Sequence, residues 1–131
     1  MAREFINPPD LATPPHNLYS QVVKVGSTVY IAGQVSRDRS GKTVHAGDVA
    51  AQVRQVWANL EKAVTAAGGS LRDIVKTTTY VVGAENLGQV REARLSLLPP
   101  ENRPTSTTLV VSGLADPDLL VEVEAVAVLG D

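Results

Sequence analysis

The sequence contains no cysteine among its 131 residues, and only 4% of its residues are aromatic. The absence of cysteine excludes disulfides, thiolate catalysis and thiolate metal sites. The scarcity of aromatic residues means that a core must be built from Val, Ala, Leu and Ile, within an apolar share of 44%. Such a composition suits close packing of helices on a sheet.

The chain also lacks a strong charge of either sign. Twelve Lys and Arg residues against 14 Asp and Glu residues give a net charge of −2, and no basic block stands out. Because nucleic-acid binding draws most of its affinity from phosphate neutralisation, a nucleic-acid partner is disfavoured. The stretch MAREFINPPD has no apolar signal region, and no apolar run reaches the ~18 residues of a membrane span. We therefore expect a soluble cytoplasmic protein.

The sequence offers little for a metal or a nucleotide. His16 and His45 are the two histidines and fall in separate predicted loops. Without cysteine, a structural zinc site is disfavoured. The glycines have no phosphate-binding spacing. We expect no metal and no other cofactor, and we interpret both histidines as exposed loop residues.

The length predicts one domain, residues 1–131. Residues 7–16 are rich in proline and predict an irregular arm, and residues 36–47 predict a polar loop. Apolar residues at helical spacing predict a helix from Asp48 to the Gly68-Gly69 pair, and a second helix over 86–98 that Pro99-Pro100 closes. Strands are predicted over five ranges: 20–25, 28–35, 73–83, 105–114 and 119–129.

This order of elements predicts an α+β sandwich with one sheet and two helices on one face. The first two strands would form a hairpin, and the last two a terminal antiparallel pair. The strand over 119–129 is largely apolar on both faces. The face away from the helices would be bare in a monomer, and large bare apolar patches mark partner surfaces. We therefore expect a homo-oligomer that packs sheets together.

Four hydroxyl residues in a row, Thr105 to Thr108, open one predicted strand. Consecutive residues of a strand point to opposite faces, so this strand places hydroxyls on both sides of the sheet. Gly33 lies inside another predicted strand, where glycine indicates a bulge or a close backbone approach. Glu122 and Glu124 share one face, about 6.6 Å apart along the strand at ~3.3 Å per residue. Two carboxylates this close raise the pKa of at least one of them.

Three stretches resemble the RidA family, also known as YjgF or L-PSP, and the resemblance runs over nearly the whole chain. They read YSQVVKVGSTVYIAGQV from Tyr19, DVAAQVRQVWANLEKAVTAAGGSLRDIVKTTTYV from Asp48, and LVEVEAVAV from Leu120. The resemblance implies a chorismate-mutase-like fold with a mixed sheet, and a homotrimer whose sheets form a central barrel with the helices outside. It also implies a small-molecule site in each cleft between subunits. The best-known members hydrolyse reactive enamines or imines, such as 2-aminoacrylate, to a 2-oxoacid and ammonia.

The resemblance assigns site roles to individual residues. Glu122 matches the glutamate that serves the proton transfers, and Tyr19 matches a tyrosine that forms a pocket wall. The alternatives are that Glu122 pairs with an arginine or sits in solvent, and that Tyr19 merely packs at an interface. Ala32 stands beside Gly33 where archetypal members have serine, so one hydrogen bond to a ligand is lost.

The largest departure from the family lies in Pro104-Thr105-Ser106-Thr107, where archetypal members read Pro-Ala-Arg-Ser. Ser106 replaces the arginine that binds the substrate carboxylate, a contact of roughly 1.5–3 kcal/mol per charged hydrogen bond. The hydroxyls of Ser106 and Thr107 would then form a neutral wall, or would bridge subunits through water.

Other arginines are candidates to replace the missing one. Arg91 and Arg94 lie on the second predicted helix, and Arg91 falls near a family pocket position. The alternative is that Arg91 is an ordinary exposed charge. Arg103 lies at an odd offset from Ser106, so on a regular strand it points to the opposite face.

Three functions stay open at this point. The first is an enamine or imine deaminase-like hydrolase with an altered substrate range. The second is a trimeric small-molecule binding protein without turnover. The third is an endoribonuclease, a label that the family carries and against which the acidic charge balance weighs.

Overall fold

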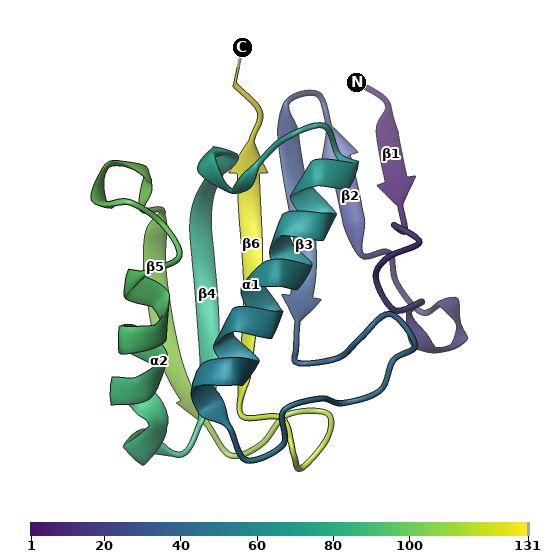
Figure 1. Cartoon of the computed structure of the whole chain (residues 1–131). Helices are drawn as coiled ribbons and strands as arrows, with labels where there is room; N and C mark the ends of the chain where they lie inside the picture. The colour runs from purple at the N-terminus through teal and green to yellow at the C-terminus, as the bar shows by residue number, and fades with distance from the viewer. Residues whose placement is uncertain (131) are drawn as a thin grey trace.

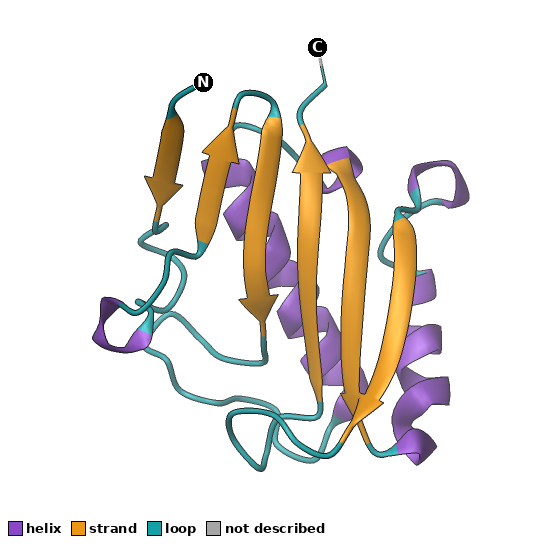
Figure 2. Cartoon of the chain, turned by 180° about the vertical axis from the view of Figure 1, so that it is seen from behind, coloured by secondary structure: helices purple, strands orange, loops and turns teal. Residues whose placement is uncertain are grey.

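The computed structural model describes residues 1–130, which form a single six-stranded sheet covered on one face by two α-helices (Figure 1). The strands are β1 (Arg3–Ile6), β2 (Val22–Val25), β3 (Thr28–Gln34), β4 (Ile74–Val82), β5 (Thr105–Val111) and β6 (Val121–Val128). The helices are α1 (Val49–Ala66) and α2 (Leu87–Leu95). Figure 2 shows the opposite face of the sheet, with both helices behind it. The predicted α+β class, with two helices on one face of a mixed sheet, is confirmed.

The strand order is β1-β2-β3-β6-β4-β5. The predicted hairpin is confirmed, since β2 and β3 pair antiparallel. The predicted terminal pair is wrong, because β6 lies between β3 and β4, antiparallel to both, while β5 pairs in parallel with β4. The physical reason is burial: β6 has an alternating buried face and takes the centre, whereas β5 is exposed at nearly every position and takes the edge.

Several element boundaries differ from the prediction. The strand β1 was not expected, because it has four residues, mostly exposed, without an apolar alternation. Helix α2 ends at Leu95 instead of Leu98, since Pro99 has no N–H to donate to the carbonyl of Leu95 and disfavours helical backbone at Leu98. Strand β5 ends at Val111 instead of Leu114.

Helix α1 supplies most of the helix side of the core. Its residues Val53, Val56 and Leu60 are at most 1% exposed and pack in one cluster with the buried face of the sheet. Burial of a side chain of this size contributes about 1.5–3 kcal/mol. Asp48 caps the helix as expected, because its side chain accepts a hydrogen bond from Ala51 N at 3.0 Å. In the part of the chain that the structure describes, no helix is long and apolar enough to cross a membrane.

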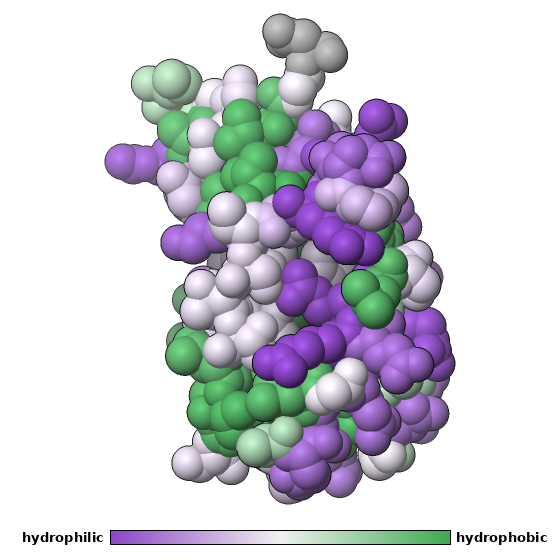
Figure 3. Space-filling model, turned by 90° about the vertical axis from the view of Figure 1, so that its left-hand side faces the viewer, coloured by the Kyte–Doolittle hydropathy of each residue, from purple (hydrophilic) through white to green (hydrophobic). Residues whose placement is uncertain are grey.

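The sheet face away from the helices carries an apolar row across four strands. Phe5, Val23, Tyr30 and Val126 are successive cross-strand partners on β1, β2, β3 and β6. Phe5 is 66% exposed and Tyr30 is 52% exposed. Figure 3 looks onto the β5 edge of the sheet, where hydrophilic surface gathers on the side of the helices and hydrophobic surface toward the other side. The expected bare face is therefore present in the single chain.

One buried amide, that of Gln52, joins α1 to two loops. Its Nε2 donates to the carbonyl oxygens of His45 at 3.2 Å and Asp118 at 2.9 Å, and its Oε1 accepts from Leu120 N at 2.9 Å. Gln52 is fully buried. These hydrogen bonds hold the start of α1 next to the segment that leads into β6, the strand that carries Glu122 and Glu124.

The variant Gln52→Ala is expected to lower the free energy of unfolding by about 2–4 kcal/mol, because it leaves buried backbone groups without partners. Chemical denaturation of the two proteins measures this difference. Gln89→Ala, at an exposed position of α2, is the matched control and should change stability by less than about 0.5 kcal/mol. Equal losses in both variants would contradict the role assigned to Gln52.

Candidate functional site

Glu122 lies on β6, on the sheet face away from the helices, against the backbone of Gly33. A Cβ atom at position 33 would overlap with Glu122 Oε2, so any larger residue there would require this carboxylate to move. The β3–β6 register shifts between Ile31 and Gln34, which places an irregularity at Gly33. The bulge and close approach expected at Gly33 are both confirmed. The carboxylate is thus held beside a backbone that bends away from regular pairing.

The two glutamates of β6 have different surroundings. Burial is the main cause that raises the pKa of Glu122, and the charge of Glu124 raises it further, while Arg37 acts in the opposite direction. Glu124 Oε1 accepts a hydrogen bond of 2.6 Å from the hydroxyl of Tyr80, which raises the pKa of Tyr80. The predicted upward shift therefore falls on Glu122. A carboxyl with a raised pKa is suited to act as a general acid near neutral pH.

A cavity of about 110 Å³ is lined in part by Gly33, the residue that Glu122 contacts, although Glu122 is not itself among the lining residues. Tyr19, Gly33, Gln34 and Arg37 line it, together with residues of the proline-rich arm. Tyr19 is 49% exposed, so its ring is open to a guest molecule. Ala32 adjoins the cavity through Gly33. The structure therefore brings together four of the residues singled out from the sequence: Tyr19, Ala32, Gly33 and Glu122.

Buried amides hold the walls of this cavity. Gln34 Nε2 donates to Gln21 Oε1 at 2.8 Å, and Gln21 Nε2 donates to the carbonyl oxygen of Ala12 at 2.9 Å. Asn59 of α1 donates from Nδ2 to the carbonyl oxygen of Arg37 at 3.0 Å. These bonds attach both the arm that carries Tyr19 and the loop that carries Arg37 to the sheet and α1.

Arg37 is a site residue that the sequence did not reveal. The sequence placed it in a polar loop, and no spacing relates it to Glu122. In the structure it is half-buried, lines the cavity, and interacts with the Glu122 charge. Its Nε is buried without a hydrogen-bond partner among the described residues. A guanidinium in this state offers donors to a carboxylate ligand.

The hydroxyl row of β5 is divided between the two faces of the sheet, as alternation predicts. Ser106 pairs with buried Thr77 and faces the helices, where its Oγ accepts a hydrogen bond of 2.9 Å from Arg94 Nη1. Thr107 pairs with Thr78, whose partner on the other side is Glu124, so it faces the side of the glutamates. Within one chain, Ser106 and Glu122 therefore lie on opposite faces.

The arginines near Ser106 are arranged differently from the expectation. Arg94, and not Arg91, is the helix residue that hydrogen-bonds to Ser106. The prediction that Arg103 points to the other face is wrong, because it lines the same cavity as Arg91 and Arg94. The reason is that β5 begins at Thr105, so strand alternation does not extend to Arg103.

The described residues contain no group of three or more His, Asp or Glu side chains placed to hold a metal ion. His16, in the 3₁₀ turn Pro15–Asn17, and His45, in a loop, are both exposed, and neither lines the cavity that contains Gly33.

Comparison with known proteins places this geometry in a family. The family model described as endoribonuclease L-PSP matches residues 10–129. The chain belongs to this family, which is also called RidA or YjgF. The resemblance inferred from the sequence is thereby confirmed.

Named relatives span almost the whole RidA-like chain. A 3-aminoacrylate deaminase RutC of Acinetobacter baylyi is 32% identical over 127 residues, which is 97% of this chain and 98% of the relative. A 2-iminobutanoate/2-iminopropanoate deaminase of Rattus norvegicus is 33% identical over 86% of this chain and 80% of the relative. A RutC family protein of Pyrococcus horikoshii is 34% identical over 88% of this chain and 90% of the relative.

Solved structures of the family have the same fold. RidA from an Antarctic Psychrobacter has a TM-score of 0.87 at 30% identity, covering 96% of this chain and 99% of its own. The YjgF gene product of E. coli has a TM-score of 0.85 at 29% identity, covering 95% and 98%. The RidA-like architecture expected from the sequence is therefore confirmed for the single chain.

The Glu122 carboxyl is expected to titrate above the usual glutamate range because it is buried and lies near Glu124, and Glu124→Gln should lower its pKa because the one charge that raises it is removed. Carboxyl ¹³C NMR across a pH titration measures both effects. Glu92→Gln, at an exposed position of α2, is the control and should leave the Glu122 titration unchanged. A Glu122 that titrates at or below the usual value would contradict the electrostatic account.

Proposed function

We propose that this RidA-family protein hydrolyses the C–N bond of small enamine or imine acids. The observation that carries the proposal is the half-buried Glu122, whose pKa is raised by burial and by Glu124 and which contacts Gly33 of the cavity that Tyr19 and Arg37 line. The deaminase names of two relatives, which align over most of the chain, support the reaction class.

In the proposed reaction on 2-aminoacrylate, the protonated Glu122 donates its proton to the terminal carbon of the enamine. Water then adds to the resulting iminium carbon, and the Glu122 carboxylate accepts a proton from that water. The hydroxyl proton of the resulting carbinolamine passes to its nitrogen as the C–N bond breaks, so that ammonia leaves and a 2-oxoacid remains. One water is consumed and Glu122 returns to its protonated state, so the cycle is balanced. The Tyr19 hydroxyl donates a hydrogen bond to the bound substrate.

Arg37 is the proposed receptor for the substrate carboxylate. Ser106 occupies the position of the family arginine and offers one neutral hydrogen bond, whereas a guanidinium binds a carboxylate through charge-assisted bonds. Arg37 reaches the cavity beside Glu122 from a different loop. Because Arg37 would bind the substrate carboxylate from a different position than the family arginine, the substrate range is expected to differ from that of family members with this arginine.

The proposed assembly is a homotrimer with its sheets turned inward and a ligand cleft between subunits. The exposed apolar row through Phe5 and Tyr30 supports it, because contact between sheets would remove this surface from water. Within one chain, Ser106 and Glu122 lie on opposite faces of the sheet. This also supports the trimer, since residues of one subunit's β5 would complete the site of the next subunit. The hydroxyl of Thr107 then belongs to the cleft wall.

The alternative is a trimeric binding protein without turnover, which the replacement of the family arginine by Ser106 favours. The two functions share the same cavity and differ in chemistry alone. An endoribonuclease activity is less well supported, because the net charge of −2 provides little attraction for RNA.

The wild-type protein is expected to accelerate the loss of 2-aminoacrylate generated in situ, and Glu122→Gln should lower kcat by about a hundredfold or more, because the amide cannot donate an acid proton. Release of the 2-oxoacid with and without protein measures turnover. Acceleration should fall as the pH rises through the raised pKa of Glu122. A Glu122→Gln variant with full activity would rule out Glu122 as the acid.

Two further variants complete this assay. Arg37→Gln should raise KM by about tenfold with a smaller effect on kcat, because one charged contact with the substrate is lost. Arg39→Gln, an exposed neighbour in the same loop, is the matched control. If the wild type shows binding of 2-oxoacids but no turnover, the binding-protein alternative holds, and a gain of activity in Ser106→Arg would trace the loss to that position.

The wild-type chain is expected to be a stable trimer at micromolar concentration, and the double variant Tyr30→Glu, Val128→Glu should be a monomer, because association would bury unpaired charges. Light scattering coupled to gel filtration measures the mass. Leu95→Glu, at an exposed apolar position on α2, is the control and should stay trimeric. A monomeric wild type would overturn the proposed assembly.

A further inference from the structure

One hydrogen bond on the sheet face away from the helices joins β4 to β6. The hydroxyl of Tyr80 donates to Glu124 Oε1 at 2.6 Å. In the β4–β6 register Tyr80 is the partner of Glu122, whereas Glu124 is the partner of Thr78. The hydroxyl therefore reaches past its own partner to the next glutamate along β6. The single proton of this hydroxyl is given to Glu124 and is not available to Glu122.

The two glutamates have different surroundings on this face. Glu122 is half-buried and its carboxylate lies against the backbone of Gly33, whereas Glu124 is exposed. Two carboxyl groups that repel each other titrate as a coupled pair. The member that is hydrogen-bonded as an anion keeps the charge, and the member that is buried keeps the proton. On this face the donor is Tyr80, and the carboxylate that it binds is that of Glu124.

Tyr80 keeps its own proton over the neutral range. Its pKa is raised by the hydrogen bond to Glu124, then by burial and by the charges of Glu124 and Glu122. The hydroxyl is therefore close enough to both carboxylates to respond to both charges. A hydrogen bond from a hydroxyl to a carboxylate is shorter and stronger than one between neutral groups, and the 2.6 Å distance is of this kind. Tyr80 thus remains a donor at every pH at which the glutamates titrate.

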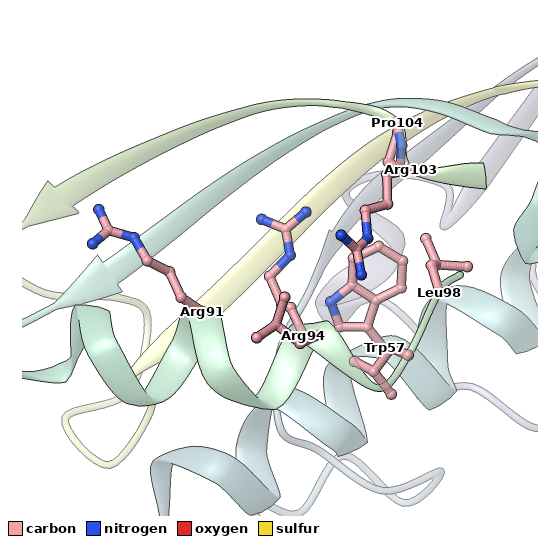
Figure 4. Close-up of a pocket in the computed structure, with 8 residues that line it drawn as sticks. Trp57, Arg91, Arg94, Leu98, Arg103 and Pro104 are labelled. Carbon is pink, nitrogen blue, oxygen red and sulfur yellow. The ribbon is translucent and has the colours of Figure 1, made fainter. Parts of the chain in front are cut away.

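The charges that act on Glu122 come from two elements. Glu124, on the same strand, raises its pKa after the larger effect of burial, and Arg37, from the loop after β3, lowers it. The arginines of α2 lie on the helix side of the sheet, beside Trp57, and do not face Glu122 (Figure 4). Strand β5 adds no charge to the face of the glutamates, where its side chains are those of Thr105, Thr107, Leu109 and Val111.

Two further titratable side chains on this face are more distant. Lys76 of β4 and Tyr30 of β3 are both cross-strand partners of Val126. Val126 lies about 13 Å from Glu122 along β6 at ~3.3 Å per residue, which exceeds the Debye length of about 8–10 Å at ordinary ionic strength. Tyr80 is therefore the β4 side chain that is placed to influence Glu122, through the carboxylate that it binds.

We propose that Tyr80 is a positioning residue for the hydrolysis proposed above, because it holds the Glu124 carboxylate as the charged member of the pair and thereby leaves the shared proton on Glu122. The inference rests on the proposed acid role of Glu122. Tyr80 does not touch the substrate and acts through Glu124. A tyrosine on the neighbouring strand thus determines which of the two carboxyl groups is the acid.

The test compares the intact wild-type protein with Tyr80→Phe by carboxyl ¹³C NMR across a pH titration. The variant keeps the aromatic ring and removes the hydroxyl alone. Its Glu122 is expected to titrate at lower pH than in the wild type, because a Glu124 without its donor takes part of the shared proton and turns toward water. Tyr30→Phe, which removes a hydroxyl from an exposed ring on the same face, is the matched control and should leave the Glu122 titration unchanged.

A double-mutant cycle separates this role from simple packing. In the Glu124→Gln background, Tyr80→Phe should cause no further fall in the pKa of Glu122, because position 124 then carries no charge for the hydroxyl to hold. If Tyr80 only packed beside Glu122, loss of the hydroxyl would shift the titration equally in both backgrounds. That result overturns the proposal, and so does a Tyr80→Phe variant whose Glu122 titrates at or above the wild-type pH.

Turnover gives a second readout. The kcat of the wild type on 2-aminoacrylate should fall as the pH rises through the pKa of Glu122, and Tyr80→Phe should move this fall to lower pH without changing the kcat reached at acid pH. An unshifted profile in an active variant would contradict the role of Tyr80. A wild type without turnover would reject the proposed hydrolysis, whereas the NMR comparison would still decide whether Tyr80 keeps the proton on Glu122.

Discussion

The place of β6 in the middle of the sheet is the constraint on which the rest of the structure depends. Val121, Val123 and Ala127 are buried beneath the helices, and both edges of the strand are hydrogen-bonded, to β3 and to β4. Alternation then places Glu122 and Glu124 on the opposite face. A strand paired on both edges cannot rotate to separate two carboxylates, so the fold itself maintains the burial and the repulsion from Glu124 that raise the pKa of Glu122.

Ser106 stands on β5 where the resemblance to the family implied an arginine, yet the chain brings guanidiniums to both faces of the sheet from other elements. Arg37 reaches the cavity beside Glu122 from the loop after β3, and Arg94 reaches Ser106 from α2. The two locations differ in what surrounds the charge. Arg37 has a carboxyl nearby, whereas the lining around Arg94 holds two more arginines and apolar walls. The same residue type therefore serves two chemically distinct cavities.

Parts of the fold and site were predictable because their signals are local. Helix α1 follows from apolar residues at helical spacing and a capping aspartate, and the β2–β3 hairpin from two strands flanking a short turn. Gly33 indicated a close approach, since a strand interior rarely tolerates glycine without a reason. Strand β1 and the central insertion of β6 were not predictable, because an exposed four-residue strand has no pattern and strand pairing joins residues distant in sequence.

The sequence by itself determined the α+β class, the family and the exclusion of cysteine chemistry. It also determined that Glu122 and Glu124 lie on the same face of their strand, because periodicity and composition are properties of neighbouring residues. Only the tertiary structure decided which carboxyl is the more buried, that Arg37 acts on its charge, and that three arginines line one cavity with Trp57. These features arise where loops, helices and strands far apart along the chain meet. Their energies depend on distance and burial, which residue order alone does not specify.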